Sequence, residues 1–297
     1  MPMLDMWEER RPSRIKVLHT HTKRAIRWGR NSSPYLSGDL FSDKSDISMY
    51  PPRFRGSQPT LKAISEARVI FCPSNRLNEF LEDYNSYINA SVIICGNSDF
   101  EFHQLPKPLP ASVKQLFLQN SFISENPLIS TLPIGIENFR WGVNGNPKFM
   151  KSDITFMDRK AEVLIGPFGL THPIRNEIKE KFSGGGISGA SLLAERCGPR
   201  EYSEIASNYR FVGAVRGNGV DTHRLWETLY RGSIPLIQND EWAMGLRGLN
   251  LPIIEIDNWE EREILEIAKS PIDRGFDAEK IEALWWPFWK KLISTYL

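Results

Sequence analysis

Short runs of apolar residues alternate along the chain with segments whose apolar positions recur at helical spacing. In the first half, apolar runs predict buried strands at 67–73, 90–97, 113–120 and 129–138. Between the first two runs the apolar side chains return every three or four residues, which predicts a helix over 74–88. Continuous apolar runs mixed with helices are typical of a sheet covered on both faces, so the pattern predicts an α/β fold.

The same alternation restarts after a turn-rich segment at 140–149, which we interpret as a hinge between two domains. Helices are predicted over 172–182 and 221–232, the second closed by Gly232. Further strands are predicted within 161–169, 209–219, 233–240 and 251–257. The aromatic, amphipathic end predicts a terminal helix broken near Pro287. The chain is thus expected to form two α/β halves that face each other, 1–140 and 141–280, followed by a C-terminal helix over 281–297.

The composition of the chain argues against some classes of function. The chain has 297 residues, of which 41% are hydrophobic and 25% charged, values typical of a globular protein with a core. Lys plus Arg total 37 and Asp plus Glu 36, a formal charge of +1, which argues against a dedicated nucleic-acid-binding protein. The first 62 residues are locally basic, with 12 basic and 6 acidic side chains, as expected of a solvated loop-rich region or of a positive rim for an anionic ligand.

Cysteine use and hydropathy bear on the cellular compartment. The three cysteines are widely spaced and form no Cys-x-x-Cys pair, which argues against a zinc site and a disulfide-stapled domain. Cys72 and Cys95 lie in apolar runs, so we expect buried, reduced thiols. No stretch approaches the ~18 apolar residues of a membrane span, and the charged start has no apolar signal core. We therefore expect a soluble, cytoplasmic protein without an integral membrane segment.

The strongest chemical signal lies in 211–235. A predicted strand leads there into a loop whose glycines permit unusual backbone angles and close approach of a ligand. The next helix begins with free N–H groups and the positive end of its dipole, which suit phosphate. Ligands of open α/β sheets bind beyond the carboxyl ends of the strands. We therefore predict a site for a diphosphate-linked sugar formed by Arg216, Gly217, Asn218, Gly219, Asp221, Thr222, His223, Arg224 and Glu227.

Individual side chains of this segment suit separate tasks. Arg216 and Arg224 can grip phosphate oxygens through paired N–H groups. Asp221 or Thr222 can cap the helix. Glu227 can accept hydrogen bonds from ribose or sugar hydroxyls. The competing interpretation is a surface loop in which Arg224 and Glu227 pair three residues apart.

The run RGNGVDTHRLWE, followed by GSIP, resembles the donor-binding segment of exostosin-like glycosyltransferases. It is most similar to their ribitol xylosyltransferase branch. The helix start is also similar in layout to that of α1,3-fucosyltransferases, which implies that Arg224 grips the donor pyrophosphate. Arg175 in THPIRNEI is similar in position to a donor-binding arginine of fucosyltransferases and is a second candidate phosphate ligand. The run LPIGIEN at 132–138 resembles the segment that precedes the second domain in such enzymes.

The resemblance implies the GT-B fold, in which two Rossmann-like domains face a cleft and a terminal helix crosses back to the first domain. The C-terminal domain is then expected to hold the nucleotide-sugar, and the N-terminal domain the acceptor side. The implied activity is transfer of a sugar, with xylose suggested by the nearest branch, from a UDP-sugar to a glycan hydroxyl. Relatives anchored in the Golgi carry an N-terminal membrane helix that this sequence lacks, so a soluble relative, or the catalytic part of an anchored one, is expected.

Two spacing arguments bear on mechanism. We find no Asp-x-Asp pair at a predicted strand end, the pair that would hold a divalent metal against the diphosphate. Arginines and a helix terminus can neutralise the leaving diphosphate instead, so we predict metal-independent transfer without a cofactor. The Glu-x7-Glu spacing of many retaining GT-B enzymes is absent around Glu227, because position 235 is Pro, and this favours inversion.

Inversion requires a general base on the acceptor side. Asp99 and Glu101 follow the predicted strand at 90–97 directly, and their aromatic neighbours could raise a carboxylate pKa. We rank Asp99 first as the general base and Glu101 second. His19 and His21, at the end of a strand predicted over 14–21, are lesser candidates.

Two other classes of function stay open at this point. A non-catalytic carbohydrate-binding protein on a GT-B scaffold would bind the donor without turnover. A dinucleotide-dependent sugar oxidoreductase would need a glycine fingerprint after an early strand. The run GGGISG at 184–189 has the letters of that fingerprint but follows a helix-like segment, so we interpret it as a loop. Trp141, beside the hinge, is a candidate contact for the acceptor sugar.

Overall fold

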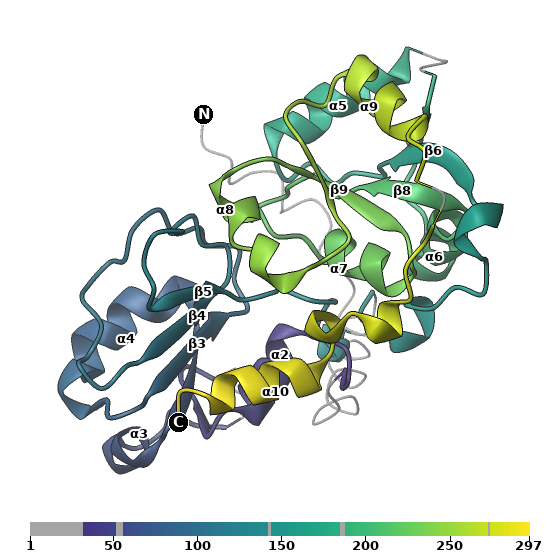
Figure 1. Ribbon diagram of the computed structural model, residues 1–297. Coiled ribbons are helices and arrows are strands. Elements are labelled where there is room, and N and C mark those ends of the chain that lie inside the picture. The colour runs from purple at the N-terminus through teal and green to yellow at the C-terminus, as the bar shows by residue number, and fades with distance from the viewer. Residues whose placement is uncertain (1–31, 52–55, 142–143, 185–187, 273) are drawn as a thin grey trace, which may run out of the picture.

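The computed structural model describes residues 32–51, 56–141, 144–184, 188–272 and 274–297. It contains two five-stranded sheets whose strands pair in parallel, which confirms the predicted α/β fold with one sheet in each half (Figure 1). The strand expected at 14–21, with His19 and His21, lies outside the described residues. Within the described residues, no helix combines the length and the apolar character that crossing a bilayer requires.

The strands of the first sheet follow one another in chain order. They are β1 (Ile47–Ser48), β2 (Val69–Pro73), β3 (Val92–Gly96), β4 (Gln115–Leu118) and β5 (Ile129–Thr131). The four predicted strands are confirmed, although β5 occupies only the start of the apolar run at 129–138. Cys72 lies opposite Cys95 on neighbouring strands, and both are buried and free of disulfides, as predicted.

The two faces of the first sheet are covered by different parts of the chain. Helices α3 (Leu61–Glu66) and α4 (Leu77–Tyr84) connect successive strands and pack on the face that carries Ile70 and Cys72. Right-handed crossovers between strands in sequential order place their helices on one face only. The other face, with Val69 and Phe71, is covered by α2 (Gly38–Lys44) and by the C-terminal helix α10 (Trp286–Ser294), which lies beside α2 (Figure 1).

The predicted C-terminal helix over 281–297 is interrupted near Pro287, as expected. A 3-10 helix at Glu282–Leu284 is followed by Trp285 in an extended conformation, and Pro287 lies in the first turn of α10. A proline is tolerated there because the N–H that it lacks would have no partner within the helix. Trp289, two residues further on, is 1% exposed and packs edge-on against Phe41 of α2 and Phe117 of β4. The end of the chain thereby supplies core to the first sheet.

The second sheet has a different strand order. Its strands β6 (Lys160–Ile165), β7 (Ala190–Leu192), β8 (Tyr209–Gly213), β9 (Ile234–Gln238) and β10 (Ile254–Ile256) are arranged as β10-β9-β8-β6-β7. After β6 the chain moves outward to β7 and then returns to the other side of β6 to form β8. The four strands predicted in this half are confirmed, whereas β7 was not predicted.

Helices cover both faces of the second sheet. Helices α5 (Pro173–Ser183) and α9 (Glu261–Ala268) pack on one face, and α6 (Pro199–Ala206), α7 (His223–Tyr230) and α8 (Glu241–Met244) on the other. Both predicted helices, α5 and α7, are present, and Gly232 follows α7 with φ +74°. Short 3-10 helices lie at Ser74–Arg76, Asn85–Tyr87, Phe139–Trp141, Pro147–Phe149, Phe156–Asp158, Arg247–Leu249, Ala278–Lys280 and Glu282–Leu284.

Buried hydrogen bonds connect the two halves. The hydroxyl of Tyr230, at the end of α7, accepts from the Leu36 N–H at 3.0 Å and donates to the Leu284 carbonyl at 2.5 Å. At the other end of α7, the His223 ring lies 2.8 Å from the Gly135 carbonyl oxygen. Helix α7 is therefore held at both ends by segments that border the first sheet.

Candidate functional site

A pocket of about 510 Å³ lies at the carboxyl ends of β6 and β8. These two strands are neighbours, but the chain leaves β6 toward β7 and leaves β8 toward β9. Such a reversal of strand order opens a crevice, because the loops that follow the two strands diverge. The volume lies within the range of small-molecule sites, about 300–1,000 Å³. The fold therefore provides a pocket at the place where the sequence predicted a ligand site.

Most of the residues that the sequence singled out line this pocket. They are Asp99, Arg175, Gly217, Asn218, Gly219, Asp221, Thr222, His223, Arg224 and Glu227. Arg216 and Glu101 do not line it. Instead, Arg216 Nη2 donates to Glu101 Oε1 at 2.5 Å, so this arginine of the second half forms an ion pair with the first half. Trp141 does not line the pocket either; it is 40% exposed, with the Arg140 guanidinium 5.2 Å from its ring centre.

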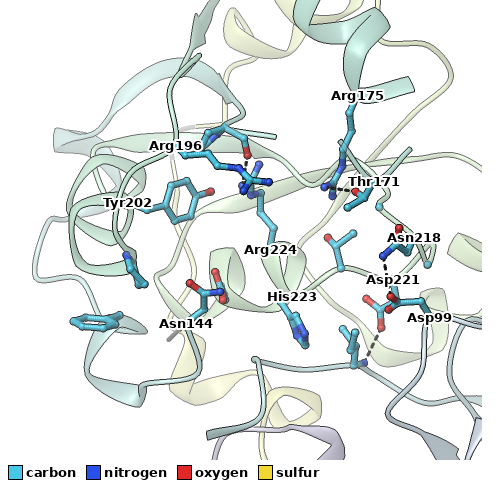
Figure 2. Close-up of a pocket in the computed structure, with 18 of the residues that line it drawn as sticks. Asp99, Asn144, Thr171, Arg175, Arg196, Tyr202, Asn218, Asp221, His223 and Arg224 are labelled. Carbon is cyan, nitrogen blue, oxygen red and sulfur yellow. Dashed lines mark hydrogen bonds between the residues drawn. The ribbon is translucent and has the colours of Figure 1, made fainter. Parts of the chain in front are cut away.

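Three guanidinium groups enter the pocket from three elements (Figure 2). Arg175 comes from α5, Arg196 from the loop after β7, and Arg224 from the first turn of α7. Burial first, and then the charges of Arg224 and Arg196, lower the pKa of Arg175 to about 10. Within the described part of the chain, none of the three forms an ion pair with a carboxylate. An anion bound among them would relieve their mutual repulsion.

The hydrogen bonds of these arginines orient them. Arg175 donates to the carbonyl oxygens of Arg216 at 2.8 Å and Val215 at 2.9 Å, and to Thr171 Oγ1 at 2.8 Å. It therefore ties α5 to the loop after β8. Arg224 donates one bond, to the Pro167 carbonyl at 2.7 Å, and its guanidinium lies 5.0 Å from the centre of the Tyr202 ring. Arg224 thus keeps more N–H groups free for a ligand than Arg175 does.

The glycines of the loop after β8 meet one of the two expectations stated for them with a contrary result. Neither Gly217 nor Gly219 has a positive φ, so the expectation of unusual backbone angles there is wrong. A Cβ on Gly217 would lie 3.0 Å from Arg175 Nη2, and one on Gly219 would lie 2.7 Å from Asn120 Nδ2. The glycines are required because these side chains pack directly against the backbone. The loop is thereby fixed against both halves.

The first turn of α7 opens into the pocket. Thr222 is its N-cap residue, but its side chain accepts no capping hydrogen bond. The expected alternative cap, Asp221, is buried and turned elsewhere: its carboxylate accepts from the Ile134 N–H at 2.7 Å and from the Trp226 indole N–H at 2.8 Å. Burial raises the pKa of Asp221 to about 7 despite these bonds. The Leu225 N–H donates to the Thr222 carbonyl at 3.1 Å, and no side chain of the described residues caps the N–H groups before it, an arrangement that suits a phosphate.

The remaining predicted side chains lie at opposite edges of the site. Asp99, exposed on the loop after β3, accepts a hydrogen bond from Asn218 Nδ2 at 3.2 Å and brings a carboxylate of the first half to the pocket (Figure 2). Glu227 lies 3.5 Å from Arg231 Nη2, one turn toward the end of α7. The surface pairing of Arg224 with Glu227 that the competing interpretation required is not formed; Arg224 bonds to Pro167 instead.

Sequence reasoning missed one wall of the pocket. This wall is formed by residues of the loop after β7 and of α6, together with Phe149 and Arg231. Strand β7 is short and half-buried at the sheet edge, so its apolar pattern is weak. A signal for α6 was present, since Pro199 precedes Tyr202, Ile205 and Ala206 at helical spacing, as at the start of an amphipathic helix.

The structure describes no metal centre. Within the described residues, no group of three or more His, Cys, Asp or Glu side chains is arranged to hold a metal ion. The GGGISG run at 184–189 lies partly outside the described residues. Among the described residues that line the pocket, arginines carry the positive charge, and the first turn of α7 lies beside them.

Comparison with known proteins adds no assignment. No protein-family model matches the chain, and the search of curated proteins gives no match either.

Proposed function

We propose that the protein is a metal-independent, inverting glycosyltransferase that uses a nucleotide-diphosphate sugar. The observation that carries this proposal is the group of three arginines, Arg175, Arg196 and Arg224, which meet at the start of α7 and have no carboxylate partner among the described residues. Guanidinium groups and helix N-termini are the two protein features best suited to phosphate oxygens. Both lie at the strand-order reversal, where open α/β sheets bind ligands.

The chemistry follows from the two sides of the pocket. An acceptor hydroxyl attacks the anomeric carbon, and the bond from that carbon to the diphosphate oxygen breaks. Asp99, the carboxylate of the first half, takes the hydroxyl proton as general base. Arg224 and Arg196 stabilise the negative charge that the diphosphate gains as it leaves, which is electrostatic catalysis by preorganised charge. Glu101 is disfavoured as the base because Arg216 already holds its carboxylate.

The resemblance to the exostosin-like enzymes adds the substrates to this proposal. The donor is a UDP-sugar, with UDP-xylose as the first candidate, and the acceptor is a glycan hydroxyl. The nearly neutral composition, with +1 formal charge, agrees with a small anionic donor and an uncharged acceptor in place of a polyanion.

A second candidate is a non-catalytic carbohydrate-binding protein with the same donor site. One observation favours it: both candidate bases are engaged, Asp99 by Asn218 and Glu101 by Arg216. Such a protein would bind the nucleotide-sugar and leave it intact. Release of free nucleotide from the donor, with and without glycan acceptors, separates the two candidates.

The test of the donor site is ligand binding to an arginine variant. Saturating UDP-, GDP- or CMP-sugar should raise the melting temperature of the wild-type protein, because a ligand at 100 times its Kd adds about 2.7 kcal/mol to stability. Arg224→Ala should weaken donor binding about 30-fold or more, since a diphosphate loses a charged, hydrogen-bonded partner. Arg262→Ala is the matched control, because this arginine is 89% exposed on α9 and pairs only with Glu266 among the described residues. Unchanged donor affinity in Arg224→Ala would refute the proposed site.

A further inference from the structure

Three buried polar atoms in the pocket wall have no hydrogen-bond partner within the described residues. They are Tyr202 Oη, Arg231 Nη1 and Thr222 Oγ1. Tyr202 and Arg231 are 8% and 3% exposed, so water does not compensate them as it would on a surface. An unpaired buried polar group costs free energy and requires an explanation, of which a missing ligand is one. Thr222 belongs to the phosphate end of the pocket, but Tyr202 and Arg231 do not.

These two side chains belong to a second compartment, which we call the tyrosine subsite and define as Phe149, Tyr202, Glu227 and Arg231. Arg231 holds it together: its Nε donates to the Phe149 carbonyl at 2.8 Å, its Nη2 lies 3.5 Å from Glu227, and its guanidinium lies 5.6 Å from the Tyr202 ring centre. In Figure 2, Arg224 lies between Tyr202 on one side and Arg175 with Asn218 on the other. The subsite therefore borders the phosphate end, with the Arg224 guanidinium 5.0 Å from the centre of the Tyr202 ring.

The distance along α7 from Arg224 to Arg231 indicates which part of a bound ligand would reach the tyrosine subsite. Arg231, the C-cap residue of α7, lies seven positions after Arg224 in the first turn. At 1.5 Å per residue this corresponds to about 10 Å. A diphosphate bound at the start of α7 would thus direct whatever is attached to it along the helix toward Arg231. In a nucleoside diphosphate the attached group is the ribose and its base.

The chemistry of the subsite favours the base. Phe149 provides apolar surface for a heteroaromatic ring, while the Tyr202 ring packs against the guanidinium groups of Arg224 and Arg231. The unpaired Tyr202 hydroxyl and Arg231 Nη1 are hydrogen-bond donors, and a guanidinium offers no acceptor. Burial raises the pKa of Tyr202, so its hydroxyl keeps its proton at neutral pH. The Glu227 carboxylate, one turn nearer the phosphate end, is an acceptor for ribose hydroxyls.

The geometry points to the tyrosine subsite as the nucleobase site of the donor, in which Tyr202 Oη and Arg231 Nη1 donate to a carbonyl oxygen of the base. This inference rests on the proposed nucleotide-sugar donor and adds a specificity to it. Uracil, cytosine and guanine carry a carbonyl oxygen, whereas adenine has none. The subsite should therefore distinguish UDP, CDP and GDP from ADP.

The test uses Tyr202→Phe, which removes only the unpaired oxygen. Because that oxygen has no partner in the free protein, its loss should leave the melting temperature unchanged or raise it. Tyr209→Phe is the matched control: Tyr209 is equally buried, at 8%, but its hydroxyl faces Lys160, outside the pocket. Calorimetric titration of wild type and both variants with UDP, CDP, GDP, ADP and inorganic pyrophosphate measures the affinities.

The expected result is a selective loss. Tyr202→Phe should bind the tightest of UDP, CDP and GDP about 3- to 10-fold more weakly than wild type, the worth of one neutral hydrogen bond. Its affinity for ADP and pyrophosphate, and all affinities of Tyr209→Phe, should stay unchanged. Equal affinities in wild type and Tyr202→Phe would overturn the inference, as would an equal loss for pyrophosphate. If wild type binds neither pyrophosphate nor any nucleotide, the proposed function itself fails, and the inference fails with it.

Discussion

The two sheets are built alike, yet only their strand orders explain why the larger pocket lies at the second one. Both have five parallel strands, but the first runs in chain order and the second reverses between β6 and β8. The pocket at the reversal has about 510 Å³, whereas a pocket at the carboxyl ends of the first sheet, near Asp39 and Asn97, has about 150 Å³. Connectivity, more than composition, thus decides which half can hold a nucleotide-sized ligand.

The same difference in connectivity explains how each half is stabilised. The second sheet is covered on both faces by helices from its own half. The first sheet, without a reversal, has its connecting helices on one face and relies on α2 and α10 for the other. The halves are therefore unequal: the second supplies most of the site, and the first supplies Asp99 and depends on the end of the chain. Four changes test this comparison.

The largest effect is expected from the one carboxylate that the first half brings to the pocket. Asp99→Asn should lower the rate of sugar transfer about 100- to 10,000-fold, the usual worth of a general base, and leave donor affinity unchanged. Steady-state kinetics and calorimetry measure the two quantities. Asp83→Asn, an exposed site on α4 of the same half, is the control and should be neutral. Transfer at the wild-type rate in Asp99→Asn would remove this residue from the mechanism.

The next largest effect is expected when the packing of α10 against the first sheet is disrupted. Trp289→Ala should lower the free energy of unfolding by about 3–5 kcal/mol, because it leaves a cavity between α10, Phe41 and Phe117. Urea denaturation followed by circular dichroism provides the value. Trp141→Ala, at a 40% exposed tryptophan, should cost much less. Equal losses in the two variants would contradict the assigned role of α10.

Asp221, which accepts a hydrogen bond from the Ile134 N–H of the first half, predicts that the free energy of unfolding depends on pH. Folding raises the pKa of this buried carboxyl from 3.8 to about 7. Between these pH values the native state binds more protons than the unfolded state, so Asp221 stabilises the fold fully below about pH 4 and loses this contribution as the pH rises to about 7. The slope is up to ~1.4 kcal/mol per pH unit.

Asp221→Asn should therefore flatten the fall in unfolding free energy across this window, as measured by urea denaturation at several pH values. The exposed Asp153→Asn provides the control, and its profile should follow that of the wild type. The comparison of slopes is informative even if Asp221→Asn is less stable at every pH, because only the titration of Asp221 alters the slope. Parallel profiles for wild type and Asp221→Asn would contradict the burial argument.

The smallest effect on nucleotide affinity is expected at the ion pair between Arg216 and Glu101. Arg216 and Glu101 are 24% and 20% exposed at their side chains, and their pair lies outside the pocket wall. Arg216→Ala should change nucleotide affinity less than about fivefold, as expected for a partly exposed ion pair. Titration of Arg216→Ala and Arg224→Ala with the same nucleotide compares the two affinities directly. A loss as large as that of Arg224→Ala would return Arg216 to the donor site.

Local patterns were enough to predict the strands of both sheets except β1 and β7. Buried parallel strands carry continuous apolar runs, and these are visible without knowledge of neighbours. Strands β1 and β7 are short, half-buried edge strands, so they lack such a run. The break near Pro287 was also predictable from the sequence, whereas the packing of the helix that begins there on the first sheet was not.

Some features of the candidate site were likewise predictable from the sequence, and others were not. The sequence by itself determined the part of the pocket that we propose for phosphate, because its strand, glycine loop, helix start and Arg224 follow one another within 211–235. Only the tertiary structure decided that Arg216 pairs with Glu101, that Gly217 and Gly219 make room for protein side chains, and that Arg196, Tyr202 and Arg231 complete the wall. Contacts between residues far apart in the chain depend on strand order, and an apolar pattern specifies that a strand is buried but not which strand lies beside it.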